Sequence, residues 1–224
     1  MKHFAIIVAG GTGQRFESQI PKQFLLLNGL PILMHSINVF KNFNSSLEII
    51  VALPPNHFKT WEDLCRQYKF YIKHEKVEGG ETRFHSVKNA LSTITQEGLV
   101  AVHDAVRPLV NKATITRCFE TAKTKGNAVP VVVLYDSIRE LKGLQSMPVD
   151  RNSYVLVQTP QVFKVNLLKE AYKQPYVPEF TDDAHVVEKA GTDIVLVEGN
   201  RENLKITDKA DLLVAEAFLK NNIF

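Results

Sequence analysis

An apolar run followed by a glycine-rich loop opens the chain. The run covers residues 5–8 and has the composition of a buried parallel strand. The loop reads Gly10-Gly11-Thr12-Gly13, and three glycines in four residues let the backbone turn tightly. Successive backbone N–H groups in such a turn form a concave site for an anion. With Arg15 and Lys22 nearby, the sequence predicts a polyphosphate-binding loop; a tight strand exit with surface basic residues is the alternative.

Two common phosphate-binding loops do not match this stretch. The Rossmann fingerprint requires a third small residue three positions after Gly13, where this chain has Phe16. The Walker loop requires the tripeptide Gly-Lys-Ser/Thr, which does not occur in the sequence. The missing third glycine, together with the lack of a hydride-transfer residue pair, also argues against an NAD-dependent oxidoreductase.

Strand-like and helix-like segments alternate along the chain. After the first strand, apolar runs predict strands at 48–53, 71–77, 99–102, 128–134, 155–158 and 193–198. Amphipathic segments predict helices that begin near Pro31, cover 56–68, 86–93 and 166–172, or are capped by Asn111, Thr181 and Thr207-Asp208. This order predicts an α/β fold with a mainly parallel twisted sheet and helices on both faces. The polar segment 136–151 predicts an extended hairpin or arm within a single domain, 1–224.

Length and charge narrow the class of protein. The chain has 224 residues, enough for one α/β domain with a proper core. Its net charge of +3 is spread along the sequence, which argues against a nucleic-acid partner. No signal peptide or bilayer-length apolar run is present, so we expect a cytoplasmic enzyme without a membrane partner. Cys65 and Cys118 form no CxxC pair and are interpreted as buried free thiols.

Polar residues cluster where the predicted strands end. Gly80 and Glu81 follow the third strand, Asp104 ends the fourth, and Thr159 follows a later one. In open α/β sheets ligands bind at the carboxyl ends of the strands, so these residues are expected to share one site. Asp104 is the candidate Mg²⁺ ligand, with nucleotide phosphates and water completing the octahedron; an Asp that caps the next turn is the alternative. His103 is interpreted as structural.

Taken in order, these motifs resemble the 2-C-methyl-D-erythritol 4-phosphate cytidylyltransferase family of nucleotidyltransferases. The resemblance covers almost the entire chain and is carried by Ala9-Gly10-Gly11-Thr12-Gly13 with Arg15, Pro21-Lys22-Gln23-Phe24, Gly79-Gly80-Glu81-Thr82-Arg83, His103-Asp104-Ala105-Val106-Arg107-Pro108, Asp150-Arg151-Asn152, Thr159-Pro160-Gln161, Thr181-Asp182-Asp183 and 198–207. It implies a Rossmann-like nucleotidyltransferase fold and transfer of CMP from CTP to a polyol phosphate. CTP would be the co-substrate, and Mg²⁺ or another divalent cation the cofactor.

The chemistry implied by this resemblance needs cations more than a base. The attacking phosphomonoester is already ionised near neutral pH, since its second pKa is about 6. The enzyme must therefore align the reactants and neutralise developing charge. The basic residues that fit this need lie in loop-like motifs: Arg15, Lys22, Arg107, Arg151 and Lys205.

The resemblance also implies a role for single residues. Four would act in catalysis, two at the α-phosphorus and two on the polyol phosphate: Arg15, Lys22, Arg151 and Lys205. The CTP site, with Asp104 as metal ligand, would comprise Ala9, Gly10, Gly11, Thr12, Gly13, Gly80, Glu81, Ser86, Asp104 and Ala105. Further contacts to the polyol phosphate would come from Arg107, Ser137, Thr159 and Thr181. In the family the arm crosses to a second subunit, so Arg107 and Ser137 would serve the neighbour's site in a homodimer.

A few positions depart from the family pattern. Ser137 stands where Thr is usual, and Asp183 stands where Glu is usual. Gly10 replaces a common Ala, and Gln14 replaces a residue that is often basic. None of these changes removes a charge that the mechanism needs.

Two other functions remain to be weighed. Ribitol-5-phosphate cytidylyltransferase shares the glycine loop, the Lys22 motif and CTP. The segments Asp150-Arg151-Asn152 and His103-Asp104-Ala105 favour the methylerythritol enzyme over it. A non-catalytic nucleotide-binding domain is the other alternative, and the presence of Arg15 and Lys22 counts against it.

Overall fold

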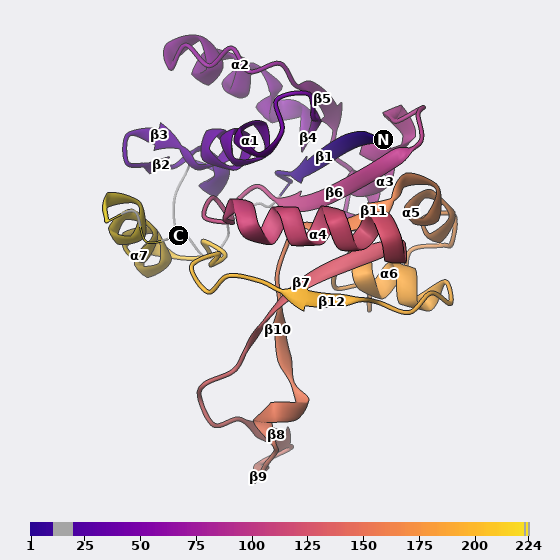
Figure 1. The fold of residues 1–224 in the computed structure, drawn as a ribbon. Helices are drawn as coiled ribbons and strands as arrows, with labels where there is room; N and C mark the ends of the chain where they lie inside the picture. Colours follow the sequence, from indigo (N-terminus) through magenta and orange to yellow (C-terminus); the bar gives the residue numbers. More distant parts are fainter. Residues whose placement is uncertain (11–19, 222, 224) are drawn as a thin grey trace.

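The computed structural model describes residues 1–10, 20–221 and 223. Four of the predicted site residues, Gly11, Thr12, Gly13 and Arg15, therefore lie outside the described residues. An eight-stranded sheet with strands in the order β10-β7-β11-β6-β1-β4-β5, and with β12 added on β7, runs through the molecule (Figure 1). Its strands are β1 (Lys2–Val8), β4 (Glu48–Leu53), β5 (Glu75–Glu78), β6 (Gly98–Asp104), β7 (Asn127–Val133), β10 (Val155–Val157), β11 (Gln161–Lys164) and β12 (Leu196–Glu198).

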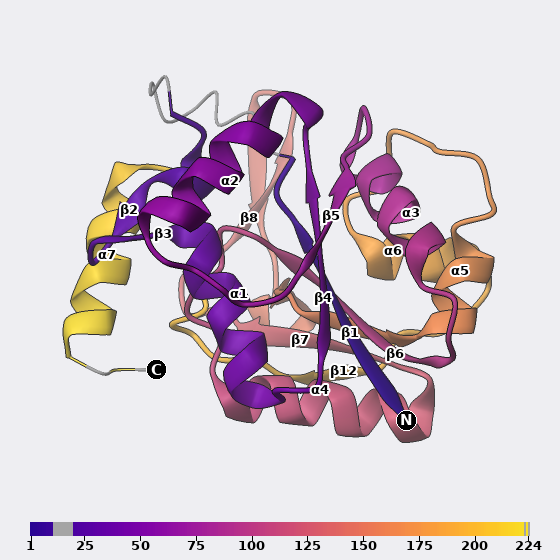
Figure 2. The same ribbon diagram turned by 90° about the horizontal axis from the view of Figure 1, so that it is seen from above.

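Both faces of this sheet are covered by helices, as predicted. They are α1 (Ile32–Phe43), α2 (Phe58–Gln67), α3 (Arg83–Thr93), α4 (Lys112–Lys125), α5 (Val165–Ala171) and α6 (Asp183–Lys189). A further helix, α7 (Lys209–Lys220), packs apart from the two clusters on the sheet faces. Successive side chains of a strand point to opposite faces. In β1, Ala5 and Ile7 pack with α1, α2 and α4, whereas Phe4 and Ile6 pack with α3, α5 and α6. Figure 2 shows α1 and α2 on one side of these strands and α3, α5 and α6 on the other.

A smaller apolar cluster lies under α7. There Ala215 packs with Leu27, from the short hairpin of β2 (Leu26–Leu27) and β3 (Leu30–Pro31), and with Val106 and Ile206. Val106 follows Asp104 and Ile206 follows Lys205, so this cluster supports the two segments that carry those charged side chains.

The sheet is mostly parallel, as predicted, with an antiparallel part that the sequence analysis did not predict. β1 is parallel to β4 and β6, whereas β11 is antiparallel to β6 and β7. The predicted strand 155–158 is found as β10, and a further strand that was not predicted, β11, follows after Thr159-Pro160. β10 and β11 pair with successive parts of β7. Pro160 has no N–H to donate to a strand partner, which explains the break between the two strands.

Several helix and strand boundaries differ from the prediction. α3 begins at Arg83 instead of 86 because Thr82 is its N-cap and accepts a hydrogen bond from the N–H of His85. α6 is capped by Asp182 and not by Thr181. The third strand is confined to β5, four residues long. The predicted Asn111 cap of α4 is confirmed, since its side chain accepts from the N–H of Thr114.

The predicted arm is confirmed as a hairpin that extends away from the body (Figure 1). Its strands are β8 (Arg139–Lys142) and β9 (Gln145–Pro148), and the 3-10 turn η4 (Arg151–Ser153) follows. The side chains of Leu141 and Leu144 are exposed on it. At its base, the guanidinium of Arg201 lies 3.8 Å from the ring centroid of Tyr135.

The sequence also predicts the state of the cysteines and whether a segment could span a membrane. Both cysteines are free, as predicted; Cys118 is buried and Cys65 is half-buried. Across residues 1–10, 20–221 and 223, no helix is both long and apolar enough to pass through a bilayer.

The side chain of Asn127 connects β7 to the segment that precedes β12 through two hydrogen bonds. Its Nδ2 donates to the carbonyl of Asp193 (2.9 Å) and its Oδ1 accepts from the N–H of Val195 (2.8 Å). Asn127→Ala removes both bonds and is expected to lower the free energy of unfolding by about 2 kcal/mol in urea titrations. Lys125→Ala, on the exposed end of α4, serves as the control and should change it by less than about 0.5 kcal/mol. Equal stabilities of the two variants would contradict this assignment.

Candidate active site

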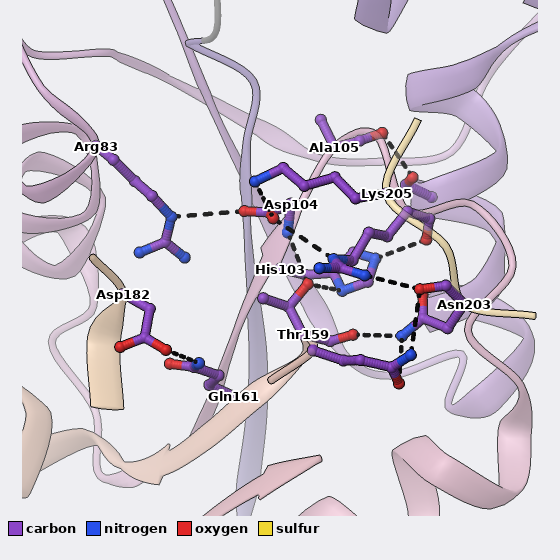
Figure 3. Close-up of polar contacts among 12 residues, drawn as sticks. Arg83, His103, Asp104, Ala105, Thr159, Gln161, Asp182, Asn203 and Lys205 are labelled. Atoms are coloured by element: carbon purple, nitrogen blue, oxygen red, sulfur yellow. Dashed lines mark hydrogen bonds and ion pairs between the residues drawn. The ribbon is translucent and has the colours of Figure 1, made fainter. Parts of the chain in front are cut away.

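The centre of the candidate site is the carboxylate of Asp104 at the carboxyl end of β6. β6 is buried along its whole length, so this end of the strand lies deep in the molecule. Three cations from separate segments face the carboxylate, and Figure 3 labels two of them, Arg83 and Lys205. Lys205 Nζ lies 2.9 Å from Oδ2, Arg83 Nε lies 3.5 Å from Oδ1, and Arg107 Nε lies 3.6 Å from Oδ2.

The cations determine the charge state of this carboxylate. Burial by itself raises the pKa of Asp104, but the positive charges of Arg83, Lys205 and Arg107 hold that pKa well below its ordinary value. Asp104 is therefore ionised at neutral pH. Three cations thus lie within 3.6 Å of this carboxylate, and a fourth, Lys22, lines the same pocket together with Glu81. Such a site attracts anionic ligands such as nucleotide and sugar phosphates.

The side chains of His103 and Thr159 form a chain of hydrogen bonds that ends at the backbone of Asp104. His103 is fully buried, and burial lowers its pKa to about 4, so the ring is neutral. Its Nε2 lies 3.0 Å from the carbonyl of Arg107 and therefore carries the proton, which leaves Nδ1 to accept from the Thr159 hydroxyl at 3.0 Å. The Thr159 Oγ1 in turn accepts the N–H of Asp104 at 3.1 Å. His103 has the structural role expected for it.

A pocket beside Asp104 brings most of the predicted CTP-binding residues together. The described ones that line it are Ala9, Gly10, Gly80, Glu81, Ser86, Asp104 and Ala105. The predicted catalytic residues Lys22 and Lys205 line the same pocket. The Ser86 hydroxyl accepts the N–H of Gly80 (3.0 Å) and donates to the carbonyl of Thr82 (3.0 Å). A Cβ on Gly80 would lie 2.3 Å from that of His85. Only glycine therefore fits there, which keeps the backbone accessible to a ligand.

Other predicted residues lie outside this pocket. Ser137 is exposed on the arm, and Thr181 is exposed ahead of α6. Arg151 lies on η4 and its guanidinium donates to the carbonyl of Tyr135. The Thr159 hydroxyl is bonded to Asp104 and His103 within the protein, and its expected contact with the polyol phosphate stays a prediction.

The side chain of Arg107 lies beside Asp104 of its own chain. Its expected role at the site of a neighbouring subunit stays a prediction. Its Nη1 donates to the backbone carbonyl of Asn203 at 2.7 Å. Arg107 belongs to the same sequence motif as Asp104, and the turn after β6 brings its side chain back to that carboxylate.

Sequence reasoning missed the contribution of Arg83. It lies in the motif Gly79-Gly80-Glu81-Thr82-Arg83, but the motif alone does not predict its pairing with Asp104. The available signal was Thr82, a favoured N-cap residue that starts α3 at Arg83 and turns its side chain toward Asp104.

The side chains of the pocket determine how a metal ion could be bound there. Within residues 1–10, 20–221 and 223, no group of three His, Cys, Asp or Glu side chains is placed to hold a metal ion. Asp104 is thus one carboxylate among several cations. Mg²⁺ is commonly bound by one or two carboxylates together with substrate phosphates and water, so one carboxylate is compatible with an ion that arrives with a nucleotide.

Comparisons with known proteins agree with this site. The family model described as IspD, 2-C-methyl-D-erythritol 4-phosphate cytidylyltransferase, matches residues 3–221. Proteins named 2-C-methyl-D-erythritol 4-phosphate cytidylyltransferase from Phocaeicola vulgatus and Bacteroides thetaiotaomicron are 51% and 49% identical to the chain. Each alignment covers 98% of this chain and 100% of the relative.

Solved structures of the same name share the fold. The crystal structure of the enzyme from Thermus thermophilus has a TM-score of 0.81 and 32% identity, and the match covers 98% of this chain and 100% of that one. The enzyme from Francisella tularensis has a TM-score of 0.81 and 31% identity over 97% and 99% of the two chains. With its nucleotidyltransferase fold, its pocket motifs and these relatives, the chain belongs to the 2-C-methyl-D-erythritol 4-phosphate cytidylyltransferase family.

Proposed function

We propose that the protein transfers CMP from CTP to 2-C-methyl-D-erythritol 4-phosphate, giving 4-diphosphocytidyl-2-C-methyl-D-erythritol and pyrophosphate. Family membership over residues 3–221 supports the reaction. The observation that carries the proposal is the pocket in which Lys22 and Lys205 converge beside Asp104. This pocket offers cations for two phosphate-bearing substrates next to one carboxylate for a metal.

The reaction is an in-line displacement at the α-phosphorus of CTP. A phosphate oxygen of the acceptor forms a bond to that phosphorus, and the bond to the pyrophosphate oxygen breaks. The acceptor phosphate is ionised near neutral pH, so no protein base is needed. Lys22, together with Arg15 as the resemblance implies, neutralises the charge that develops at the α-phosphorus. Lys205 holds the acceptor phosphate, and Gly80 and Ser86 line the cytidine side of the pocket.

A divalent cation, Mg²⁺ by preference, fits at Asp104. Two acidic residues, Glu81 and Asp104, line the pocket, and Asp104 is the one that pairs with Lys205. The ion would neutralise charge on the nucleotide phosphates when bound. Asp104 would hold it together with phosphate oxygens, while Lys205 turns from the carboxylate toward the acceptor phosphate.

The arm is proposed to complete the site of a second subunit in a homodimer. It carries exposed apolar side chains, among them Leu141 and Leu144, which a partner would cover. Ser137 and Arg151 lie on this arm and away from the pocket of their own chain. We therefore assign them to the neighbour's acceptor phosphate. A cytoplasmic location stays a prediction from the sequence.

Loss of the Lys22 charge should affect the chemical step. Lys22→Ala is expected to lower kcat by about 10²–10³, since an electrostatic partner of the transition state is lost, with little change in the KM for CTP. Steady-state pyrophosphate release measures both constants. Lys59→Ala, at an exposed lysine on α2, is the control and should match the wild type. An unchanged kcat in Lys22→Ala would refute the role.

The metal assignment predicts a specific defect in Asp104→Asn. The amide keeps the shape of the side chain but loses the charge that attracts a cation, so the Mg²⁺ concentration at half-maximal rate should rise at least about tenfold. Calorimetric titration of Mn²⁺ into the protein with bound CTP should show the same loss of affinity. Asp63→Asn, in an exposed ion pair with Arg66, is the control. Normal Mg²⁺ dependence in Asp104→Asn would contradict the assignment.

A hybrid dimer tests whether the arm serves the neighbour. Lys22→Ala disables the site of its own chain, whereas Arg151→Ala should disable the site of its partner. A hybrid carrying one variant on each chain, isolated with two different tags, would keep one intact site and should show about half the wild-type rate. If the hybrid is no more active than the two parent variants, Arg151 acts within its own chain or not at all.

A further inference from the structure

The guanidinium of Arg83 contacts two carboxylates, that of Asp183 and that of Asp104. Its Nη2 donates to Oδ2 of Asp183 at 2.7 Å, and its Nε lies 3.5 Å from Oδ1 of Asp104. Asp183 is the first residue of α6 and is completely buried. Tyr172, at the end of α5, donates its hydroxyl to the other oxygen of Asp183 at 2.6 Å. Both oxygens of Asp183 are thus taken, one by each partner.

The side chains of Tyr172 and Asp183 are held in place by their contacts. A buried carboxylate is stable only when it is paired and hydrogen-bonded, and Asp183 meets both conditions. The Tyr172 ring is 2% exposed and stacks on Phe84, with ring centroids 4.6 Å apart. Burial raises the pKa of Tyr172 well above its ordinary value, and the charge of Asp183 adds to this, so its hydroxyl stays a proton donor.

Of the three cations described around Asp104, Lys205 and Arg107 face Oδ2, whereas Arg83 faces Oδ1. Lys205 and Arg83 differ in their freedom. The side chain of Lys205 is 43% exposed, whereas that of Arg83 is 27% exposed and is also bonded to Asp183. Lys205 can therefore turn toward a bound phosphate, while Arg83 stays in place. Figure 3 shows Arg83 and Lys205 approaching Asp104 from different directions.

We propose that Asp183 and Tyr172 form a buried anchor that fixes Arg83, and that Arg83 is a positioning residue that keeps the Asp104 carboxylate oriented when Lys205 leaves it. This inference rests on the proposed function, in which Asp104 holds the metal and Lys205 the acceptor phosphate. The anchor joins the N-termini of α3 and α6 to the end of β6, so three elements far apart in the chain determine the orientation of one carboxylate.

The central test is Asp183→Asn, which keeps the shape and the acceptor for Tyr172 but removes the charge that holds Arg83. With Asp104 less well oriented, kcat should fall about tenfold while the KM for CTP stays within about twofold. Arg83→Lys keeps a charge but cannot bridge two carboxylates, and should show the same loss. Tyr172→Phe removes only the hydroxyl and should lower kcat about threefold.

A rescue and a stability control separate positioning from folding. Asp183→Glu restores the charge and should retain at least about half of the wild-type kcat. Val187→Ala, at a fully buried position of the same helix, should lower Tm as much as Asp183→Asn does and leave kcat unchanged. Calorimetry should show wild-type CTP affinity in every variant.

The outcomes distinguish this inference from the proposed function. An active wild-type protein with unchanged kcat in Asp183→Asn and Arg83→Lys overturns the positioning role alone. Equal losses of kcat in Val187→Ala and Asp183→Asn also overturn it, since they would reflect folding. If Asp183→Asn does not fold, Arg83→Lys and Tyr172→Phe decide the question by the same criteria. A wild-type protein that releases no pyrophosphate from CTP and the acceptor overturns both proposals.

Discussion

The ion cluster around Asp104 is the interaction on which the site depends. A carboxylate buried at the end of a central strand would be neutral or destabilising without partners. Arg83, Arg107 and Lys205 supply those partners from α3, from the turn after β6 and from the segment that leads into α7. Because each cation approaches from a different part of the chain, formation of the cluster requires that the whole α/β body be folded. The geometry of the site around Asp104 therefore depends on the complete fold.

The segment that carries Lys205 is held by bonds between side chains and the backbone. Gln158 donates to the carbonyl of Asn200 (2.9 Å), and Asn203 donates to the carbonyl of Thr159 (2.8 Å). A Cβ on Gly199 would lie 2.4 Å from Oε1 of Gln158, so a larger residue would displace that amide. These contacts connect the break between β10 and β11 to Lys205. The interruption in the sheet is thus part of what positions the lysine.

Local features of the sequence were sufficient to predict many elements. β4 has the predicted bounds, since its apolar run stops at two prolines, and Asn111 caps α4 as its residue type suggests. Asp104 lies at the end of a strand for a similar reason: the apolar run 99–102 ends two residues before it. The general position of the pocket follows from the rule that ligands bind at the carboxyl ends of parallel strands.

The remaining features depend on contacts between distant parts of the chain. Arg83 finds its partners 21 and 100 residues away, at Asp104 and Asp183, and no local pattern signals such a pairing. The direction of Arg107 depends on how the turn after β6 folds back, and β11 is only four residues long beside a proline. Residue motifs could therefore name the members of the site but not their orientation.

The central claim is tested most directly by pyrophosphate release from the purified protein with CTP and Mg²⁺. The acceptor would be 2-C-methyl-D-erythritol 4-phosphate in one reaction and ribitol 5-phosphate in another. We expect rapid release with the first acceptor and none above background with the second. Release with ribitol 5-phosphate alone would contradict the assigned acceptor, and no release with either, in a protein that binds CTP, would contradict the assignment of an enzymatic function.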